Sequence, residues 1–159
     1  IGYSYDGADA SFELLARRIM GEIPRYISIK EYDVSVKKNK SGEIISSAKA
    51  QLEVDKKLIL CEGEGNGPVH ALDNAIRKNV DKLAKYSQYL KDLKLVDYKV
   101  RILNTGTEAV TRVSIESTDS KGKNWFTIGV SANIIDASFK ALIDSLDYKL
   151  FKDNAPASL

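Results

Sequence analysis

The chain alternates between stretches in which apolar residues recur at every second position and stretches in which they recur every third or fourth. Apolar side chains occupy alternate positions over 26–36, which predicts a half-buried β-strand. The polar run over 37–42 that follows predicts a hairpin turn. Two further strands are predicted over 44–54 and 58–64.

A helix is predicted directly after the third strand. Pro68 suits the first turn of a helix because an N–H at that position would be unpaired in any case. One stripe at helical spacing then follows, formed by Val69, Leu72, Ile76, Val80 and Leu83. The first half of the chain therefore reads as three strands and a helix.

The second half repeats this order. Strands are predicted over 93–103, 109–117 and 124–130, turns over 104–107 and 119–122, and a helix from 135 to about 150. Equivalent residues lie 66 positions apart, as Tyr32 and Tyr98 do, or Gly63 and Gly129. The predicted fold class is α+β, with two internal βββα repeats that each contain an antiparallel three-stranded sheet and one helix. Since each sheet would keep a face uncovered, we expect the repeats to pair in a homodimer.

Two segments lie outside the repeats. Phe12, Leu15 and Ile19 follow small and acidic residues at helical spacing, which predicts a short amphipathic helix that ends at Gly21 and is detached from the repeats. We assign 1–24 to this linker helix, 25–90 to repeat one, 91–152 to repeat two, and 153–159 to a frayed tail. The first residue is Ile1 rather than methionine, which indicates a piece of a longer protein.

Composition narrows the class of protein. The 159 residues are 43% hydrophobic and 29% charged with a net charge of +2, as in one ordinary globular domain without a strongly charged partner. No apolar run approaches the roughly 18 residues of a membrane span, and no signal-peptide pattern opens the chain, so we expect a cytoplasmic protein that binds no membrane. The single cysteine, Cys61, lies in an apolar run and is expected to pack in the core.

The glycine-rich segment 63–67 allows two interpretations. In the first, the segment binds a small anion, because the backbone N–H groups at the start of the following helix attract negative charge. In the second, its glycines only allow the chain to turn sharply. A dinucleotide fingerprint would need glycine where Pro68 stands, and the Gly-Lys-Ser/Thr ending of a phosphate loop is missing. His70, the only histidine, cannot form a catalytic triad or a three-ligand metal site alone and is expected at the helix start. We predict no catalytic residue and no metal ligand in this chain.

Two further groups of residues have competing interpretations. Lys37, Lys38 and Lys40 suggest RNA contact, but the nearly balanced charge and the lack of an aromatic pair at strand spacing favour a solvated turn, so we expect no nucleic-acid partner. The second group belongs either to an apolar pocket or to the core, and consists of Tyr98, Ile102, Val113 and Ile115.

Four segments together resemble the C-terminal regulatory domain of the α-isopropylmalate synthase and citramalate synthase enzymes. They are YDGADASFELL at 5–15, GEGNGPVHAL at 63–72, VDYKVR at 96–101 and WFTIGVSANIIDAS at 125–138. The resemblance covers nearly the whole chain, and its first and last segments are most similar to the citramalate synthase branch.

The resemblance implies a full-length enzyme whose N-terminal (β/α)8 barrel condenses acetyl-CoA with a 2-oxo acid on a divalent metal. Those cofactors belong to the missing barrel, so this fragment is expected to be inactive. The fragment would be the feedback sensor: a homodimer that binds L-isoleucine, or alternatively L-leucine, at the seam of two subunits, and that is coupled to its own barrel through the linker helix. A dimerisation module without a ligand is the remaining alternative.

The resemblance also implies effector-binding residues at matching positions. In the second repeat these are Leu95, Tyr98, Ile102, Ala109, Thr111, Ala132 and Ile134. In the first repeat the glycine segment supplies Gly65, Gly67 and Ala71, as the expected partners of the amino acid's carboxylate.

Overall fold

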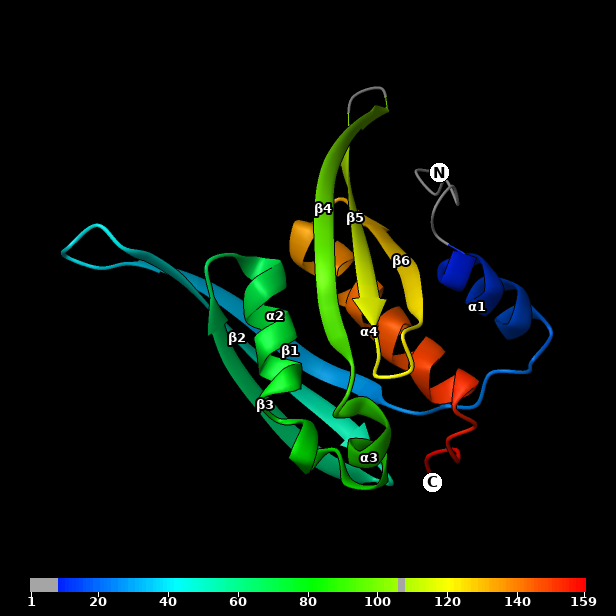
Figure 1. Ribbon diagram of the computed structural model, residues 1–159. Coiled ribbons are helices and arrows are strands. Elements are labelled where there is room, and N and C mark those ends of the chain that lie inside the picture. Colours follow the sequence, from blue (N-terminus) through cyan, green and yellow to red (C-terminus); the bar gives the residue numbers. More distant parts are fainter. Residues whose placement is uncertain (1–8, 106–107) are drawn as a thin grey trace. The chain divides into compact units, whose positions relative to one another are not determined.

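The computed structural model describes residues 9–105 and 108–159 (Figure 1). The described chain forms two compact units, and each contains one antiparallel three-stranded sheet. The first-repeat unit comprises 25–91 and 156–159, while the second-repeat unit comprises the segment up to Pro24 and 92–155. The predicted α+β class with one βββα arrangement in each repeat is confirmed.

The first-repeat unit follows the predicted order of elements. Its strands and main helix are β1 (Ser28–Lys38), β2 (Ile44–Val54), β3 (Lys57–Gly65) and α2 (Pro68–Arg77), followed by short 3₁₀ turns and α3 (Ser87–Leu90). The prediction of one helix reaching Leu83 was wrong, because α2 ends at Arg77. The side-chain amide of Asn79 donates to the carbonyl oxygen of Ala75, in the last turn of the helix, at 2.6 Å and to that of Glu62, on β3, at 3.0 Å. It ends the helix by bonding one of its last carbonyls and ties that end to β3.

The second-repeat unit has the same order. It contains β4 (Lys94–Thr105), β5 (Glu108–Thr118), β6 (Asn124–Ser131) and α4 (Ile134–Lys152), preceded in sequence by α1 (Asp9–Ile19). The turn predicted over 104–107 falls partly on residues outside the described ranges. Within those ranges, no helix is both long enough and apolar enough to pass through a membrane.

One turn in each unit has the same construction, although the two do not occupy equivalent positions in the repeats. In the β1–β2 turn, Oδ1 of Asn39 accepts from the backbone N of Ser41 and Glu43, and Gly42 has a φ of 87°. In the β5–β6 turn, Asp119 accepts from the backbone N of Lys121 in the same way, and Gly122 has a φ of 75°. Both turns combine a side chain that bonds its own backbone with a glycine in the left-handed region. The predicted turn at 119–122 is confirmed, and that at 37–42 is confirmed from Asn39 onward, because Lys37 and Lys38 belong to β1.

A close contact between strand and helix explains why glycine and alanine recur in both repeats. A Cβ atom on Gly63 would lie 2.7 Å from Cα of Ala75, and one on Gly129 would lie 2.9 Å from the backbone N of Ala141. Neither glycine has a positive φ. Glycine on the third strand and alanine on the helix therefore let the two backbones approach, and the sharp-turn interpretation of Gly63 was wrong.

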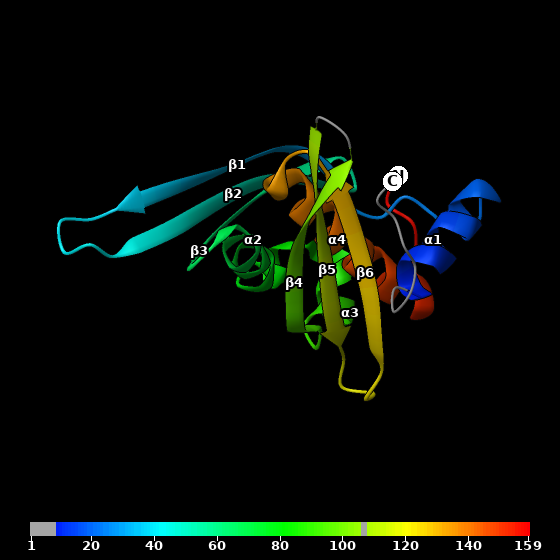
Figure 2. The same cartoon turned by 90° about the horizontal axis from the view of Figure 1, so that it is seen from above.

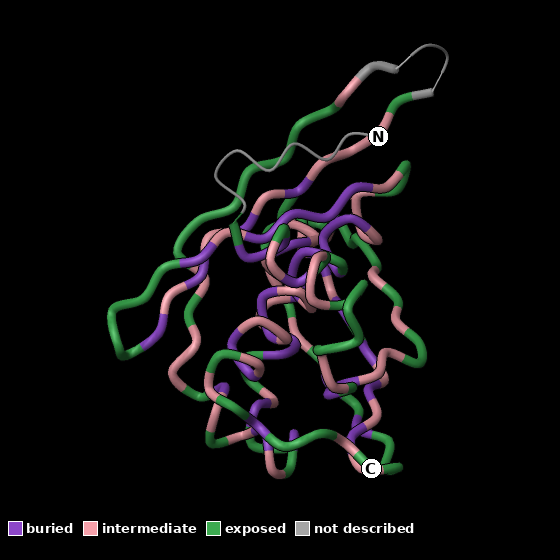
Figure 3. The backbone as a smooth tube through the Cα atoms, turned by 90° about the vertical axis from the view of Figure 1, so that its right-hand side faces the viewer, coloured by how far each residue is buried: buried purple, intermediate pink, exposed green. Residues whose placement is uncertain are grey.

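The core of the first-repeat unit lies between α2 and strands β2 and β3, and that of the second-repeat unit lies between α4 and strands β5 and β6. Figure 3 shows the buried stretches of the backbone in purple. In the first-repeat unit the fully or nearly fully buried apolar residues include Ala48, Ala50, Leu52, Val54, Cys61, Leu72 and Leu83. In the second-repeat unit they include Val113, Ile115, Ile128, Ala137, Phe139, Leu142 and Leu150. The packing role expected for Cys61 is confirmed.

Helix α1 packs within the second-repeat unit, so the prediction of a detached helix was wrong. It contacts β6 and α4 (Figure 2), and Oγ of Ser11 accepts from the backbone N of Ile128 at 2.8 Å. Along β6, the edge strand that α1 covers, Ile128 and Val130 are buried. The equivalent positions of repeat one are Glu62 and Glu64, which are exposed and need no such cover.

The C-terminal residues are held in the first-repeat unit rather than frayed. The backbone N of Ser158 donates to the carbonyl of Arg25 at 2.8 Å, and that of Leu159 donates to Oδ1 of Asp55 at 2.9 Å. The hydroxyl of Tyr86 donates to the carbonyl of Pro156 at 2.8 Å. Apolar periodicity carries no trace of such backbone pairing, which is why the sequence reads as a loose end.

Candidate functional site

The first strand of the second sheet carries an apolar strip that its own helix does not cover. Strand β4 is an edge strand, and α4 packs on β5 and β6. Tyr98, Val100 and Ile102 pair with Ile115, Val113 and Thr111 in the ladder, so they point to the same side as α4. Even so, Tyr98 and Val100 are each 40% exposed and Ile102 is 70% exposed. We call these three residues the β4 strip.

The first-repeat unit carries an equivalent strip at an offset of 66 positions. Tyr32, Val34 and Val36 lie along the edge strand β1 on the side of α2, and Val36 is 66% exposed. Beyond it on the same hairpin, Ile44 is 54% exposed. Rows of large apolar side chains at the surface of a domain mark places where another protein surface or a ligand packs. Both repeats therefore leave apolar side chains exposed on their first strand.

The structure brings most of the second-repeat candidates to one end of the sheet. Ile102 is paired with Thr111, and Thr111 is paired with Ser131, the last residue of β6. Ala132 follows in the connection to α4, Ile134 is the first residue of α4, and Ala109 lies two residues before Thr111 on β5. Five of the predicted effector residues thus surround the point where β6 passes into α4.

Leu95 and Tyr98 lie further along β4. Leu95 pairs with Ser117 near the opposite end of the strand, seven residues and about 23 Å from Ile102. Tyr98 lies between them, about 13 Å from Ile102. Of the four residues that allowed a pocket or a core interpretation, Val113 and Ile115 are fully buried, whereas Tyr98 and Ile102 are exposed. The core interpretation therefore holds for the first two only.

The first-repeat candidates surround the start of α2. A Cβ atom on Gly65 would lie 2.7 Å from the backbone N of Ala71, and Ala71 is fully buried. Gly67 is the N-cap residue, with extended backbone at a φ of −159° and open space around it. Nδ1 of His70 accepts from the backbone N of Asn66 at 3.3 Å, which confirms its predicted place at the helix start.

The two main helices begin differently at equivalent positions. Oδ1 of Asn133 caps α4 by accepting from the backbone N of Ile135 at 2.8 Å and of Asp136 at 3.3 Å. Gly67 is its counterpart 66 positions earlier and has no side chain with which to cap α2. First-turn N–H groups of α2 therefore keep their capacity to bond an anion.

Replacement of Asn133, the N-cap of α4, tests how much the capping bonds contribute to the stability of the fold. We expect Asn133→Ala to lower the free energy of unfolding by about 1 kcal/mol, because two backbone donors lose their acceptor. Asn133→Asp keeps an acceptor oxygen beside the positive end of the helix and should unfold as the native chain does. Urea unfolding followed by circular dichroism measures both variants, and equal losses in the two would contradict the capping role.

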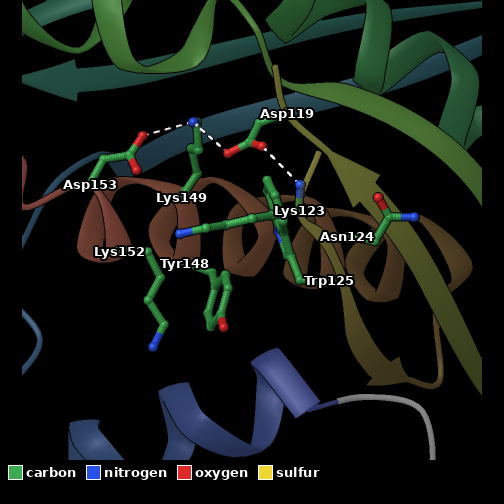
Figure 4. Close-up of a pocket in the computed structure, with 8 residues that line it drawn as sticks. All are labelled: Asp119, Lys123, Asn124, Trp125, Tyr148, Lys149, Lys152 and Asp153. Atoms are coloured by element: carbon green, nitrogen blue, oxygen red, sulfur yellow. Dashed lines mark hydrogen bonds and ion pairs between the residues drawn. The ribbon is translucent and has the colours of Figure 1, made fainter. Parts of the chain in front are cut away.

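A pocket of about 340 Å³ lies near the other end of α4, inside the second-repeat unit (Figure 4). Its apolar wall is formed by Trp125 and Tyr148, whose ring centroids are 5.8 Å apart. Its polar wall is formed by Lys149, which is only 2% exposed and whose Nζ lies 2.9 Å from Asp119 and 2.7 Å from Asp153. Asp92 adds a third carboxylate at 3.5 Å.

The charges in this pocket compensate one another. Burial would lower the pKa of Lys149, but hydrogen bonds to Asp153 and Asp119 outweigh it, and the pKa is raised. Burial likewise acts to raise the pKa of Asp119, but the bonds from Lys149 and from the backbone of Lys123 hold it below its usual value. The lysine therefore stays charged and joins α4 to the β5–β6 turn. Sequence analysis assigned Asp119 only to a turn and missed Lys149 altogether.

Side chains that would serve metal or thiol chemistry are not gathered at any of these places. Over the described residues, no three His, Cys, Asp or Glu side chains are grouped in a way that could hold a metal ion. Burial raises the pKa of the Cys61 thiol, which disfavours the reactive thiolate.

The duplicated βββα fold and its two exposed strips define the class of this chain as a two-repeat α+β domain with apolar side chains at the surface of each first strand. Comparison with known proteins identifies the family of this domain. The chain belongs to the family described as the LeuA allosteric (dimerisation) domain, whose model matches residues 6–150. It is 46% identical over 154 residues to the (R)-citramalate synthase of Geobacter sulfurreducens, which covers 95% of this chain and 28% of that protein. The corresponding enzyme of Aquifex aeolicus is 45% identical over 155 residues, covering 96% of this chain and 29% of that protein.

The likeness extends to a second group of enzymes. The 2-isopropylmalate synthase of Clostridium acetobutylicum is 36% identical over 105 residues, which cover 65% of this chain and 17% of that enzyme. The chain thus spans less than a third of the length of the relatives that it matches. It is a regulatory and dimerisation domain of this synthase family.

Proposed function

We propose that this chain is the feedback-inhibition domain of an acetyl-CoA-dependent synthase that condenses a 2-oxo acid, of the citramalate type, and that it binds L-isoleucine where two copies meet. Membership of the allosteric domain family supports the regulatory role. Relatives named (R)-citramalate synthase, at 46% and 45% identity, support the branch. Catalysis and its metal would belong to the part of those proteins that this chain does not span, and the cytoplasm would be the place of action.

The observation that carries the proposal is the β4 strip. Its exposed side chains end beside Thr111 and Ile134, and small residues such as Ala109 and Ala132 leave room there. A second copy packed on the strip would bury it and enclose a small apolar gap. A branched aliphatic side chain buried in such a gap gains about 1.5 to 3 kcal/mol.

The charged ends of an amino acid need hydrogen bonds if they are to leave water. The N-terminus of α2 at Gly67 has no side-chain cap, so its first-turn N–H groups can serve a carboxylate, while Gly65 and Ala71 hold that helix close to β3. In the second repeat the corresponding N–H groups already donate to Asn133, so they are not available to a carboxylate. This asymmetry favours the first glycine segment as the partner of the carboxylate.

Two alternatives differ in what is bound. L-leucine has the same volume as L-isoleucine, and the similarity to a 2-isopropylmalate synthase supports it as an effector. A dimerisation module without a ligand would use the same strips and bind neither amino acid.

Calorimetric titration of this chain with isoleucine, leucine and valine separates the three. We expect saturable heat with isoleucine and weaker binding of valine, since one methylene is worth roughly 1 kcal/mol. Preferential binding of leucine would assign the domain to the other branch. A dimer that binds none of the three would leave dimerisation as its function.

A charge placed on the β4 strip tests whether the strip forms the subunit contact. We expect Ile102→Lys to convert a dimer into a monomer in sedimentation equilibrium, because the ammonium group would be buried without a partner. The matched control is Lys99→Ala, which changes β4 on its opposite face and should leave the dimer intact. Unchanged association of Ile102→Lys would place the interface elsewhere.

A further inference from the structure

The contact between α1 and the rest of the second-repeat unit contains an unusual balance of charge. Arg18 of α1 reaches α4 and bonds two carboxylates there, while Arg17 of the same helix lies over the ring of Phe151 of α4. Its Nη1 lies 2.9 Å from Oδ1 of Asp144, and its Nη2 lies 2.9 Å from Oδ2 of Asp147. Two acids that share one guanidinium leave an excess negative charge when both are ionised.

Asp144 and Asp147 differ in the hydrogen bonds that their carboxylate oxygens receive. Asp144 also interacts with the hydroxyl of Ser11, which in turn accepts from the backbone N of Ile128. Oδ1 of Asp147 is buried and has no hydrogen-bond partner among the described residues. A buried carboxylate oxygen without a donor is costly when charged but acceptable when it carries a proton.

Both carboxyl groups reflect this environment. Burial raises the pKa of Asp147 to about 7, the opposing attraction of Arg18 being offset in part by repulsion from Asp144. Burial also raises the pKa of Asp144, against the attraction of Arg18. Glu13 and Lys152 form a separate ion pair at 2.7 Å in the same interface.

We propose that Ser11, Arg18, Asp144 and Asp147 form a proton-sensitive latch, which holds α1 on α4 and β6 firmly when the acid pair carries one proton and loosens when that proton is lost near neutral pH. The latch is independent of effector binding. It controls how firmly α1 docks on α4 and β6, whether or not an amino acid is bound. Its consequence is that the outward apolar side chains of α1, among them Leu15 and Ile19 at 43% and 78% exposure, are presented on a more mobile helix as the pH rises.

The direction follows from linkage. An acid whose pKa is higher in the docked state than in the released state favours docking at low pH, and this preference disappears as the pH rises from the released value, 3.8, to about 7. Between pH 5.5 and pH 7.5 the population of released α1 should therefore increase on the order of tenfold.

Hydrogen exchange of the whole chain without any amino acid tests the latch directly. The protection factor of each α1 amide, which is the intrinsic exchange rate divided by the observed rate at the same pH, should fall on the order of tenfold from pH 5.5 to pH 7.5. The amides of α2, in the other unit, serve as an internal reference and should change little.

Two variants identify the acid. Asp147→Asn imitates the protonated side chain, so α1 should be equally protected at both pH values. Asp144→Asn removes the repulsion that helps raise the pKa of Asp147, so the loss of protection should begin at a lower pH. Equal protection of native α1 at the two pH values, or an unchanged pH dependence in Asp147→Asn, would overturn the latch. Neither result would bear on isoleucine binding, which is measured separately.

Discussion

Replacement of Gly129 by alanine should lower the free energy of unfolding by about 3 kcal/mol or prevent folding altogether. The added Cβ would lie 2.9 Å from the backbone N of Ala141 and closer still to the carbonyl oxygen of Ala137. These are backbone atoms of α4, so no rotamer change can relieve the clash and the helix must move away from β6. Overpacking of this kind costs about 1 to 3 kcal/mol even where flexible side chains can adjust.

The matched control is Gly67→Ala. Gly67 also has no positive φ, and a Cβ atom there meets no atom within 4 Å. Its substitution affects only the N-cap and should cost less than about 1 kcal/mol. Guanidinium unfolding of both variants measures the difference, and a similar loss in the two would show that the third strand and its helix do not need glycine in order to approach. Gly63→Ala should repeat the result of Gly129→Ala in the other unit.

Replacement of Lys149 by methionine should lower the free energy of unfolding by about 3 to 5 kcal/mol. The variant keeps the aliphatic stem but leaves Asp119, whose side chain is 2% exposed, and Asp153 without their shared cation. Removal of one partner from a buried ion pair is costly because the remaining charge stays desolvated. Lys121→Met is the control: it removes a cation that also bonds Asp153 but is 58% exposed, and it should cost less than about 1 kcal/mol.

The effect of Lys149→Met should depend on pH in a defined direction. Burial acts to raise the pKa of Asp119 and Asp153, but bonding to Lys149 outweighs it and lowers both pKa values below 3.8. Their contribution to stability is therefore present at neutral pH and is lost as the pH falls through those lowered values. The difference in unfolding free energy between native chain and variant should therefore shrink on acidification. A constant difference from pH 7 to pH 3 would show that lost packing, not charge, explains the variant.

The sequence predicts the repeated architecture well because a period of two and a period of 3.6 are direct consequences of burial on one face. Strand alternation in the first repeat and the stripe around Leu72 and Ile76 reflect the same core. Helix ends are less visible. Val80 and Leu83 continue the apolar stripe and are buried, yet they lie beyond α2, because a single amide of Asn79 ends the helix. Periodicity reports which side chains are buried, not which backbone groups are bonded.

Contacts made by the ends of the chain were missed for the same reason. Ser11 attaches α1 to β6 through one hydroxyl, and Asp55 holds Leu159 through one carboxylate. Neither leaves a periodic signal. At the candidate site, the family resemblance identified Ile102, Thr111 and Ile134, which the fold places at one end of a sheet. The buried Lys149 was invisible because a lysine on a helix normally faces water.

Each repeat is completed by a segment from the far end of the chain. The segment that precedes both copies completes the later copy, since α1 covers β6, and the segment that follows both copies completes the earlier one, since 156–159 bond to residues of the first sheet and its turns. A cut between residues 91 and 92 would therefore yield two halves that each lack a piece carried by the other. Each repeat is therefore complete only in a chain that also carries the other.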